Sequence, residues 1–431
     1  MKRYESYKDS GVKWLGEIPG HWEVYKLKYL FRLNKIKNVG NTCNTILSLS
    51  YGKIIIKKDI NEGLTPESYE SYQLLNKGDI VIRSTDLQND HTSLRTGLVK
   101  SDGAITSAYI GLKNLNVNLY DSRYYHYFLH DWDITKAIYN EGKGLRQSLN
   151  WDDIKNMLLP VLDINEQTAI ANYLDTVTSK IDEAISQQQK MIDLLNERKQ
   201  IIINNAVTKG LNPDAPMKDS GVEWIGEIPE HWEICKLKRV ANGFSNGTSA
   251  TQITFGTTPY SVTRIETITT GSINYDKVGY VKKDSSLNRY LLKKNDVLIS
   301  NINSFERVGN CAIYDGQHEL YHGMNLLRIT PLDNIVPEYL LYSLKSANYM
   351  GQMRRACKPA INQVSVPSSV VKGIIITFPP LSEQEEIAIY CSRALQCIED
   401  SVDNCKKQIS LLQERKQIII NDVVTGKIKV S

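Results

Sequence analysis

The dipeptide His-Trp occurs twice in this chain, at His21 and at His231, and histidine is the residue type best suited to acid–base chemistry near neutral pH. Both copies belong to a repeated segment, which reads KDSGVKWLGEIPGHWEVYKLK at residues 8–28 and KDSGVEWIGEIPEHWEICKLK at 218–238. Sixteen of the 21 positions are identical. A twinned catalytic site is one interpretation of this pattern. We favour a structural role, in which each histidine caps a buried tryptophan at the base of a globular domain.

Several sequence patterns that carry catalysis are missing from the 431 residues. The chain has no GxGxxG or GxxxxGK[ST] loop for a nucleotide, and no Asn-Pro-Pro-Tyr or Asp-Pro-Pro-Tyr tetrapeptide of the amino-methyltransferases. Its seven cysteines form no CxxC pair, which predicts reduced thiols rather than a zinc cluster or a disulfide framework. We therefore expect no catalytic residue, no metal site and no cofactor bound by this chain.

The composition is that of a globular protein, with 41% hydrophobic and 23% charged residues. No stretch reaches about 18 consecutive apolar residues, so no membrane span is expected. The polar start MKRYESYKDS lacks the apolar core of a secretory signal. These features predict a cytoplasmic protein.

Basic residues gather in two stretches that contain no acidic residue. Residues 24–58 hold eight lysines and arginines, and residues 234–265 hold four. The net charge of +4 is too small to indicate a nucleic-acid partner by itself, so the distribution of charge matters more than the sum. A basic face on each of two domains fits phosphate binding, because lysine and arginine supply most of the sequence-independent affinity for nucleic acids. A solvated basic surface without a ligand is the alternative.

Polar loops near these stretches contain the residue types that read DNA bases. Arginine contacts guanine through two hydrogen bonds, and asparagine and glutamine contact adenine in the same way. The candidate DNA-binding residues are Lys35, Lys37, Arg83, Ser84, Thr85, Arg95, Lys143, Arg146 and Gln147 in the first half, and Arg264, Asn301, Asn303, Arg307, Lys358, Asn362 and Gln363 in the second half.

The elements that would position these loops follow from a duplication of the chain. The segment LLNERKQIIINNAVT at 194–208 recurs as LLQERKQIIINDVVT at 411–425, with 12 of 15 positions identical and an offset of 217 residues. A Glu-Gln pair, which begins at Glu166 and at Glu383, recurs with the same offset. Between these frames, residues 31–160 and 241–378 barely align. We infer that two shared frames hold two divergent inserts, each of which recognises something different.

Apolar residues at alternating steps of four and three follow Pro160, and the same spacing recurs in the second half, which indicates a long helix with a coiled-coil seam in each half. Proline and glycine are absent from these runs until Gly210 and Gly426, so each helix can extend over about 40 residues, or about 60 Å. A pseudo-twofold axis would pair the two helices antiparallel, and separate surface helices are the alternative. The expected seam residues are Leu174, Ile181, Ile185, Ile192, Leu195, Leu395, Ile398, Val402, Ile409 and Leu412.

Each insert has the pattern of a compact α+β globule. Segments such as NTILSLSYGKIIIKK, GDIVIRST and GAITSAYIGLK are rich in β-branched residues and bounded by glycine or asparagine, as strands are. Residues 121–140 and 337–357 have the pattern of one amphipathic helix in each insert. The predicted fold is α+β, with two pseudo-twofold-related globular domains joined by a pair of long antiparallel coiled-coil helices. The predicted domains are 1–160 and 211–380, with the central helix at 161–210 and the last helix at 381–431.

Three motifs together resemble the specificity (S) subunits of type I restriction–modification enzymes. They are the start KDSGVxWxGEIPxHWE, the run GLRQ ahead of LPVLDINEQ, and the helix ERKQIIIN. The resemblance covers the whole chain, in the right order and twice. One departure is that KPAINQVSVPSS in the second half replaces the GLRQSLNWDD of the first half, which leaves the transfer of residues to that loop open.

The resemblance implies two target recognition domains, each of which reads one half of a split double-stranded DNA sequence. It also implies that the helix pair sets the spacing of the half-sites and docks two methyltransferase (modification) subunits, with restriction subunits joining the full complex. In that family the S subunit has no active site. S-adenosylmethionine, ATP and Mg are expected on the partner subunits.

Two other functional classes are open alternatives. The chain could be a coiled-coil protein-interaction scaffold without DNA specificity, and the acid-free basic stretches argue weakly against this. It could also be an enzyme in its own right, such as a fused methyltransferase or nuclease, which the missing motifs make the least favoured hypothesis. Salt-sensitive DNA binding would separate the first of these alternatives from a specificity subunit.

Overall fold

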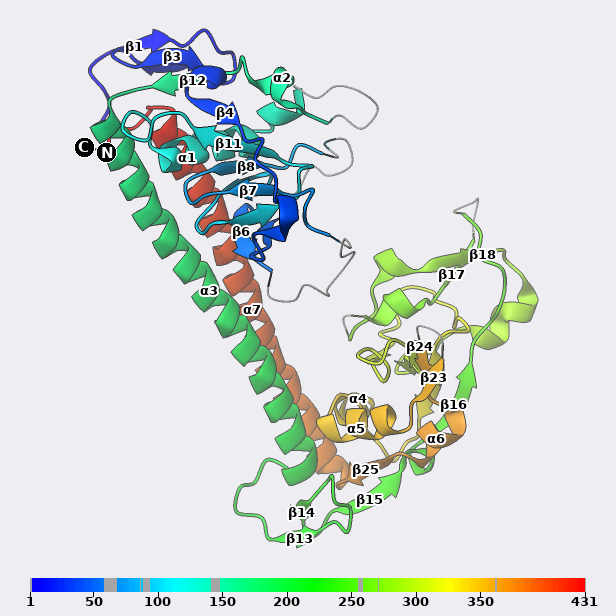
Figure 1. Ribbon diagram of the computed structural model, residues 1–431. Coiled ribbons are helices and arrows are strands. Elements are labelled where there is room, and N and C mark those ends of the chain that lie inside the picture. Colours follow the sequence, from blue (N-terminus) through cyan, green and yellow to red (C-terminus); the bar gives the residue numbers. More distant parts are fainter. Residues whose placement is uncertain are drawn as a thin grey trace. The chain divides into compact units, whose positions relative to one another are not determined.

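The computed structural model describes residues 2–57, 68–85, 87, 94–140, 148–254, 259–269, 271–360 and 363–430. The chain forms two compact units. Unit 1 comprises Met1–Gln189 and Lys406–Ser431, and unit 2 comprises Lys190–Cys405. Each unit contains one globular domain and about one half of each of two long helices (Figure 1). The units therefore cut across both helices, whereas the predicted domain boundaries separate the helices from the globules.

The two long helices are α3, Ile164–Lys209, and α7, Leu381–Val424, with 46 and 44 residues. Their lengths are close to the predicted 40 because proline and glycine are absent from both. Gly210 follows α3 with a φ of 73°, and Gly426 follows α7 with a φ of 77°. A left-handed residue after the last turn is the usual helix stop, and glycine adopts it without strain.

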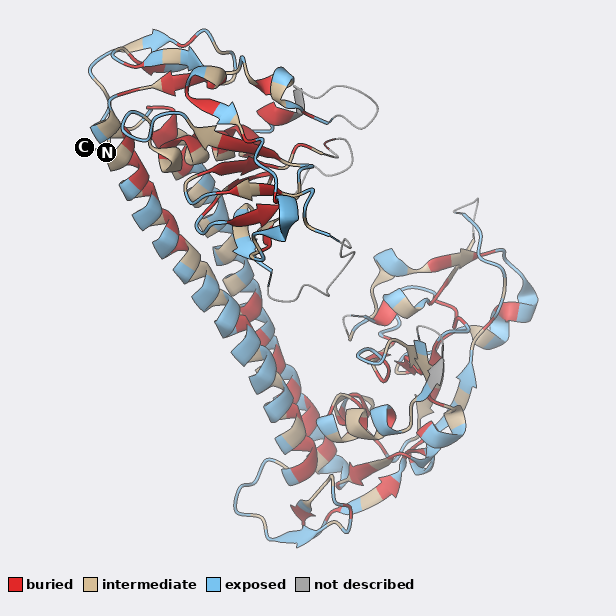
Figure 2. Ribbon diagram, viewed as in Figure 1, coloured by how far each residue is buried: buried red, intermediate tan, exposed pale blue. Residues whose placement is uncertain are grey.

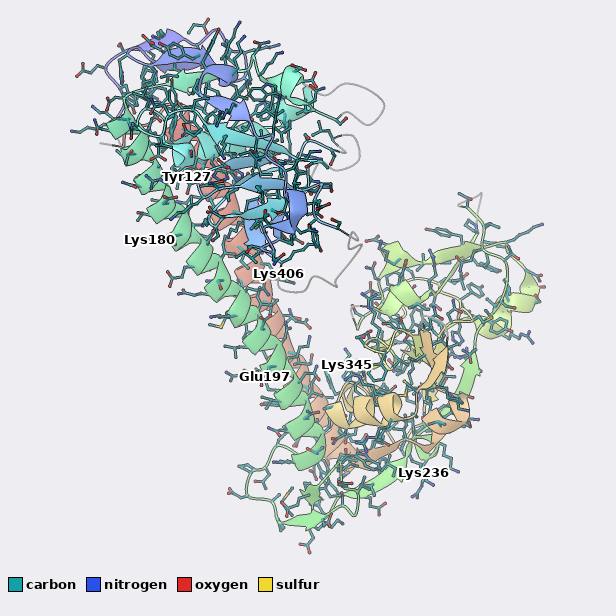
Figure 3. The ribbon with its side chains drawn as sticks, viewed as in Figure 1. Tyr127, Lys180, Glu197, Lys236, Lys345 and Lys406 are labelled. Carbon is teal, nitrogen blue, oxygen red and sulfur yellow. The ribbon has the colours of Figure 1, made fainter. Side chains whose placement is uncertain are left out.

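The alternating apolar residues mark the packed face of these helices. Lys180 and Glu197, which are not part of the pattern, are exposed along the outer side of α3 (Figure 3). Six of the ten expected seam residues are buried, namely Leu174, Ile181, Ile192, Leu395, Ile398 and Val402, and the other four, Ile185, Leu195, Ile409 and Leu412, are half-buried.

An ion pair joins the two long helices inside each unit. In unit 1, Nζ of Lys416 in α7 lies 2.6 Å from Oδ1 of Asp182 in α3. In unit 2, Nζ of Lys199 in α3 lies 2.5 Å from Oε1 of Glu399 in α7. The first half of each helix thus lies beside the second half of the other. The helices are antiparallel within each unit, as the duplication predicts.

The globular domain of unit 1 is built on a four-stranded antiparallel sheet in the order β4-β11-β8-β9. Helix α1, Ser122–Ile134, packs against β9, and the short helix α2 covers Trp151–Ile154. Four two-stranded pairs, β1-β2, β3-β12, β5-β6 and β7-β10, complete the domain. The strands are β1 Tyr7–Asp9, β2 Glu17–Pro19, β3 Glu23–Lys26, β4 Phe31–Leu33, β5 Leu47–Ser50, β6 Lys53–Ile56, β7 Gln73–Leu75, β8 Ile80–Ile82, β9 Thr96–Leu98, β10 Gly103–Ile105, β11 Ile110–Asn114 and β12 Leu158–Val161.

The globular domain of unit 2 repeats this sheet in the order β16-β22-β19-β21, so two inserts that barely align in sequence share one topology. Its short helices are α4 Pro337–Ser343, α5 Ala347–Arg355 and α6 Ser368–Gly373. The strands are β13 Met217–Asp219, β14 Glu227–Pro229, β15 Glu233–Lys236, β16 Ala241–Asn246, β17 Tyr260–Val262, β18 Gly279–Val281, β19 Val297–Ile299, β20 Ile302–Asn303, β21 Cys311–Ile313, β22 Leu327–Pro331, β23 Lys358–Ala360, β24 Gln363–Ser365 and β25 Ile375–Phe378.

Large aromatic side chains are buried in the core of each unit, and the buried segments are red in Figure 2. Trp22 and Trp132 are buried in unit 1 in a cluster that includes Leu174 of α3 and Val423 of α7. In unit 2, Trp232 is buried in a cluster that includes residues of both long helices. The apolar ends of the helices are therefore part of the domain cores. The seven cysteines are free thiols.

Two expected elements differ from the structure. Residues 337–357 form two helices, α4 and α5, because the hydroxyl of Ser346 accepts a hydrogen bond from the backbone nitrogen of Tyr349 and starts a new helix. In the first insert, α1 ends at Ile134, and a short 3₁₀ turn follows at Ala137–Asn140. Within the described residues, none of the helices combines the length and the apolar character needed to cross a membrane.

Candidate nucleic-acid interface

One carboxylate holds the repeated His-Trp segment of unit 1 to the start of α3. Glu166 accepts hydrogen bonds from the hydroxyl of Tyr4 at 2.7 Å and from the indole nitrogen of Trp22 at 3.3 Å. Nε2 of His21 lies 2.9 Å from the other oxygen of Glu166. Since Glu166 is in the first turn of α3, its negative charge is also favoured by the helix dipole.

The same joint occurs in unit 2 at the start of α7. Nε2 of His231 lies 2.6 Å from Glu383, and the indole nitrogen of Trp232 donates to the second oxygen of Glu383 at 2.9 Å. From the sequence we expected each histidine to cap its tryptophan directly, and the structure shows that it does not. Each histidine and its buried tryptophan bind one carboxylate, which lies in the first turn of a long helix.

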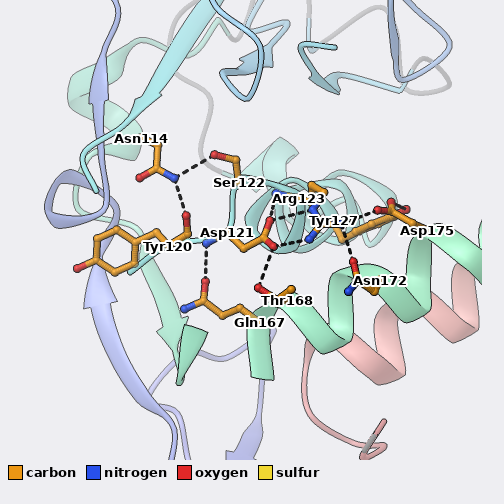
Figure 4. Close-up of polar contacts among 10 residues, drawn as sticks. All are labelled: Asn114, Tyr120, Asp121, Ser122, Arg123, Tyr127, Gln167, Thr168, Asn172 and Asp175. Atoms are coloured by element: carbon orange, nitrogen blue, oxygen red, sulfur yellow. Dashed lines mark hydrogen bonds and ion pairs between the residues drawn. The ribbon is translucent and has the colours of Figure 1, made fainter. Parts of the chain in front are cut away.

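The next residue of each frame, a buried glutamine, ties the helix start to the backbone of the insert (Figure 4). Gln167 accepts from the backbone nitrogen of Asp121 at 2.8 Å and donates to the carbonyls of Leu119 and Leu162 at 3.0 and 2.8 Å. Its partner Gln384 makes the equivalent contacts in unit 2, where it accepts from Val336 and donates to Pro379 and Asn334. The repeated Glu-Gln pair is thus the anchor of each globular domain.

The ends of the helices hold the opposite side of each domain. In unit 1 the amide of Asn421 donates to both oxygens of Asp131, at 3.1 and 3.0 Å, near the end of α1. Asn204, 217 residues earlier, has the matching role in unit 2 and accepts from the backbone nitrogen of Ala347 at 2.7 Å. Each domain is therefore fixed by the start of one long helix and the end of the other.

Sheet strands end at the candidate loop of unit 1. Strand β8 ends at Ile82, immediately before Arg83, and the loop is pinned where the backbone nitrogen of Leu149 donates to the carbonyl of Ser84 at 2.8 Å. Arg95 was predicted to contact bases, but its side chain is buried and donates to the carbonyl of Thr85 at 2.8 Å. We correct this prediction: Arg95 supports the loop from within the domain, because a buried guanidinium must satisfy its donors there.

The described candidate residues of unit 2, apart from Arg264, belong to or flank the strands of the small sheet β20-β24-β23. Asn301 is buried and donates to the carbonyl of Val366 at 3.3 Å, so it too has a structural partner. Asn303 donates to the hydroxyl of Ser300 at 2.9 Å and is half-buried. Arg307 is exposed in the same loop.

The candidates fall into three groups by exposure. Lys35, Lys37, Arg264, Arg307, Lys358 and Gln363 are exposed, Arg83, Thr85 and Asn303 are half-buried, and Ser84, Arg95 and Asn301 are buried. Lys143, Arg146, Gln147 and Asn362 lie outside the described residues. A role of the exposed and half-buried side chains in DNA binding stays a prediction.

The sequence model of the type I restriction modification DNA specificity domain matches residues 229–409. The MjaX type I restriction enzyme specificity subunit of Methanocaldococcus jannaschii is 38% identical over 205 residues, 47% of this chain and 47% of that protein. The MjaVIII type I restriction enzyme specificity subunit of the same organism is 24% identical over 435 residues, 98% of this chain and 97% of that protein. The chain is therefore similar to type I restriction enzyme specificity subunits over nearly its whole length.

The length of the match differs among these specificity subunits. The chain spans about half the length of MjaX and, with 24% identity over 258 residues, 53% of the EcoKI specificity subunit of Escherichia coli. A chain from a structural study of complex assembly and conformational transition of the type I R-M system matches with a TM-score of 0.70 and 15% identity, over 95% of this chain and 99% of that chain. The HsdS subunit of Thermoanaerobacter tengcongensis matches with a TM-score of 0.51 and 16% identity, over 95% and 98%. These structures show that the fold is shared.

Two patterns of catalytic type in this chain were not identified from the sequence. The first is HELYH at 318–322, which has the HExxH spacing of zinc proteases. That motif binds zinc when both histidines lie on one face of a helix, but residues 318–322 are not helical, and Nε2 of the buried His322 contacts the carbonyl of Leu326 at 2.9 Å. In the described part of the chain, no group of three or more His, Cys, Asp or Glu is arranged to hold a metal ion.

The second pattern is GFSNG at 243–247, which has the GxSxG spacing of a hydrolase nucleophile. A nucleophilic serine of this type stands on a sharp turn between a strand and a helix. Ser245 instead lies inside β16, and its hydroxyl donates to the carbonyl of Gly243 at 3.1 Å. The spacing is therefore present without the geometry that the chemistry needs.

A basic groove in unit 1 contains three cations that the candidate residues did not include, namely Lys28, Arg32 and Lys113. Arg32 of β4 and Lys113 of β11 line it together with Lys35 and Lys28. Arg32 lies in the acid-free stretch, so its charge was visible in the sequence. Lys113 comes from a strand more than 80 residues later, and only the pairing of β4 with β11 brings it to the same place.

Proposed function

We propose that this chain is the non-catalytic subunit that selects the DNA target of a type I restriction–modification complex. Each recognition domain binds one half of an asymmetric, bipartite double-stranded sequence and directs the associated methyltransferase and restriction subunits to it. The observation that carries this proposal is a frame in which the histidine and tryptophan contacts to Glu166 recur at Glu383, around two domains of one topology and different sequence. Such divergence is what two different half-sites require.

The partners follow from a second repeated feature. Leu194 and Ile201 in α3 are both more than half exposed, and so are Leu411 and Ile418 at the equivalent positions of α7. Residues seven apart lie on the same face of a helix, so each half carries the same apolar stripe, and exposed apolar surface of this kind favours a protein partner. Two equal stripes support the binding of two modification subunits, one at each stripe.

The chemistry is assigned to the partner subunits. We place S-adenosylmethionine, ATP and Mg on those subunits and no cofactor on this chain. Because the substrate is DNA, we also place the complex in the cytoplasm. The alternative, a coiled-coil scaffold without DNA specificity, accounts for the apolar stripes but leaves the basic groove with Arg32 and Lys113 without a role.

The experiment that tests the proposal maps methylated adenines across the genome of cells that produce the chain with its modification subunits. We expect one bipartite motif with a fixed gap. Exchanging residues 31–155 for the insert of another family member should change one half of the motif and leave the other half unchanged. Methylation without any motif would contradict the proposal. The scaffold would also be favoured if the purified complex did not bind DNA, or if its DNA binding did not depend on salt.

A further inference from the structure

The basic groove of unit 1 lies along the edge strand of its four-stranded sheet. It has a volume of about 940 Å³, and its walls come from β4 with the residues that follow it, from Lys113 of β11, and from the start of α2 at Trp151. Four cationic side chains line it, namely Lys28, Arg32, Lys35 and Lys113. The groove therefore presents a concentration of positive charge beside two aromatic residues, Phe31 and Trp151.

The two carboxylates in the groove wall are already engaged. Asp152 forms an ion pair with Lys155 at 2.5 Å. Asp153 accepts from the backbone nitrogen of Asn150 at 2.9 Å and completes the cap of α2. Neither is an ion-pair partner of the groove cations in the structure, so the charge of the groove stays positive.

Arg32 and Lys113 stand directly opposite each other on neighbouring antiparallel strands. Like charges in this position repel and destabilise a sheet. The buried carboxyl of Asp79 interacts with both cations: its pKa is raised by burial, and the charges of Lys113 and Arg32 oppose that rise only in part. Among the described residues, no side-chain hydrogen bond or ion pair engages Arg32, Lys35 or Lys113. Negative charge bound along the groove would offset this repulsion.

The second recognition domain lacks this charge at the equivalent place. There, Asn242 of β16 faces Thr330 of β22 in the same register. The hydroxyl of Thr330 donates to Asp296 at 2.6 Å, and Asp296 is the counterpart of Asp79. The cross-strand cation pair is therefore a property of the first domain alone and is not part of the shared frame.

The chain segments that form two walls of the groove lead to the candidate loop of unit 1. The chain leaves β4 through Asn34, whose backbone nitrogen donates to the carbonyl of Gly111 at 2.8 Å, and so runs toward the sheet end where β8 stops and Arg83 follows. On the other wall, Asn150 directly follows Leu149, which is pinned to Ser84 of that loop. A strand of DNA held at the loop would continue along the groove.

We infer that the groove binds the sugar–phosphate backbone of DNA beside the half-site read by the first domain, with Arg32, Lys35 and Lys113 contacting consecutive phosphates. This inference rests on the proposed function and adds an asymmetry to it. The first domain has a phosphate-binding groove beside its half-site, and the second domain does not.

The test uses the full chain in complex with its modification subunits and a duplex that carries the mapped motif. R32N/K113T transplants the neutral pair of the second domain, and the new threonine can donate to Asp79 as Thr330 does to Asp296, so the sheet is expected to fold. K8N/K13T removes the same charge from two exposed lysines of unit 1 outside the groove and is the matched control. K35S, which changes one exposed residue, is a second groove variant.

Binding is measured from about 50 to 200 mM salt. Because each phosphate contact contributes about 0.9 to the slope of log affinity against log salt, R32N/K113T should lower the slope by about 1.8 and K35S by about 0.9. Motif and non-motif duplexes should be weakened by the same factor, since phosphate contacts carry no sequence information. Phosphate-ethylation interference should lose signals only beside the first domain's half-site.

The outcomes separate the inference from the proposed function. If the unaltered complex shows no salt-sensitive, motif-specific binding, the proposed function itself fails. If it binds and R32N/K113T has the slope of K8N/K13T, the groove does not hold phosphate and the inference is overturned. Loss of interference signals at the other half-site would also overturn it, because the phosphate contacts would then lie beside the second domain.

Discussion

Trp22 donates its indole hydrogen to Glu166 at 3.3 Å, and Trp232 donates in the same way to Glu383 at 2.9 Å. Each carboxylate lies in the first turn of a long helix, and each tryptophan lies at the base of a recognition domain. The repeated His-Trp segment therefore has a mechanical role, which explains why it occurs once in each half. It fastens each domain to the first turn of one long helix.

The first prediction concerns this joint. E166A removes the acceptor for Tyr4, His21 and Trp22 and leaves the buried indole N–H without a partner, which costs about 1–3 kcal/mol. E166Q keeps one acceptor oxygen and should cost less. Hydrogen exchange of the full complex checks this, because it reports on unit 1 separately from unit 2. The exposed Glu183 of the same helix provides the control E183A, and equal protection in E166A and E183A would contradict the prediction.

The second prediction concerns the length of the helix pair. Deleting residues 185–191 from α3 together with 402–408 from α7 removes one heptad at equivalent positions and keeps the apolar seam in phase. Seven residues correspond to about 10 Å of helix, so the gap in the recognised motif should shorten by about three base pairs while both half-sites stay the same. Adenine-methylation mapping measures the gap. A change in the bases read, rather than in the gap, would show that the helices do not set the spacing.

The third prediction concerns pH. His126 and His130 of α1 stack with ring centroids 5.9 Å apart, and burial lowers their pKa values to about 3 and about 4, with Lys100 and Lys416 adding repulsion. The unfolded chain binds protons at these histidines below about pH 6.5 and the folded chain does not. Unfolding free energy should therefore fall as pH falls from about 6.5 toward 4.

The matched variant for this prediction is H126S/H130A, which introduces the residues found 217 positions later, Ser343 and Ala347. The difference in stability between the unaltered chain and this variant isolates the two histidines from the carboxylates that also titrate. As the pH falls, the unfolding free energy of the unaltered chain should decrease relative to that of the variant. A difference that is constant from pH 7 to pH 4 would show that the histidines are accessible to protons in the folded state.

Much of the fold was predictable from the sequence because it depends on periodicity and repetition. The spacing from Leu174 to Leu195 defines the buried face of α3, and the offset of 217 relates Lys416–Asp182 to Lys199–Glu399. The break between α4 and α5 was missed because a single N-cap, Ser346, outweighs the apolar pattern on either side of it.

The site was less predictable because its contacts join distant parts of the chain. The Glu-Gln pair was visible as a repeat, but its link to Trp22, 144 residues earlier, depends on the fold. Lys113 reaches the groove only through its register with Arg32. Polar residue type does not report exposure, so Asn301 was indistinguishable in sequence from an exposed reader of bases.

The last prediction separates positioning from contact at Arg95. Its buried guanidinium donates to the carbonyls of Thr85 and Arg83 at 2.8 and 3.4 Å, and its backbone nitrogen donates to Asp133. R95A should therefore destabilise the loop by about 1–3 kcal/mol. It should also reduce discrimination at the first half-site as a whole, with the second half-site unchanged.

A residue that contacts a base would behave differently, because its loss relaxes specificity at one position and leaves stability intact. Hydrogen exchange in unit 1, measured with a competition assay over single-base changes, distinguishes the two roles. Relaxed specificity at one base pair with unaltered exchange would return Arg95 to the residues that read DNA.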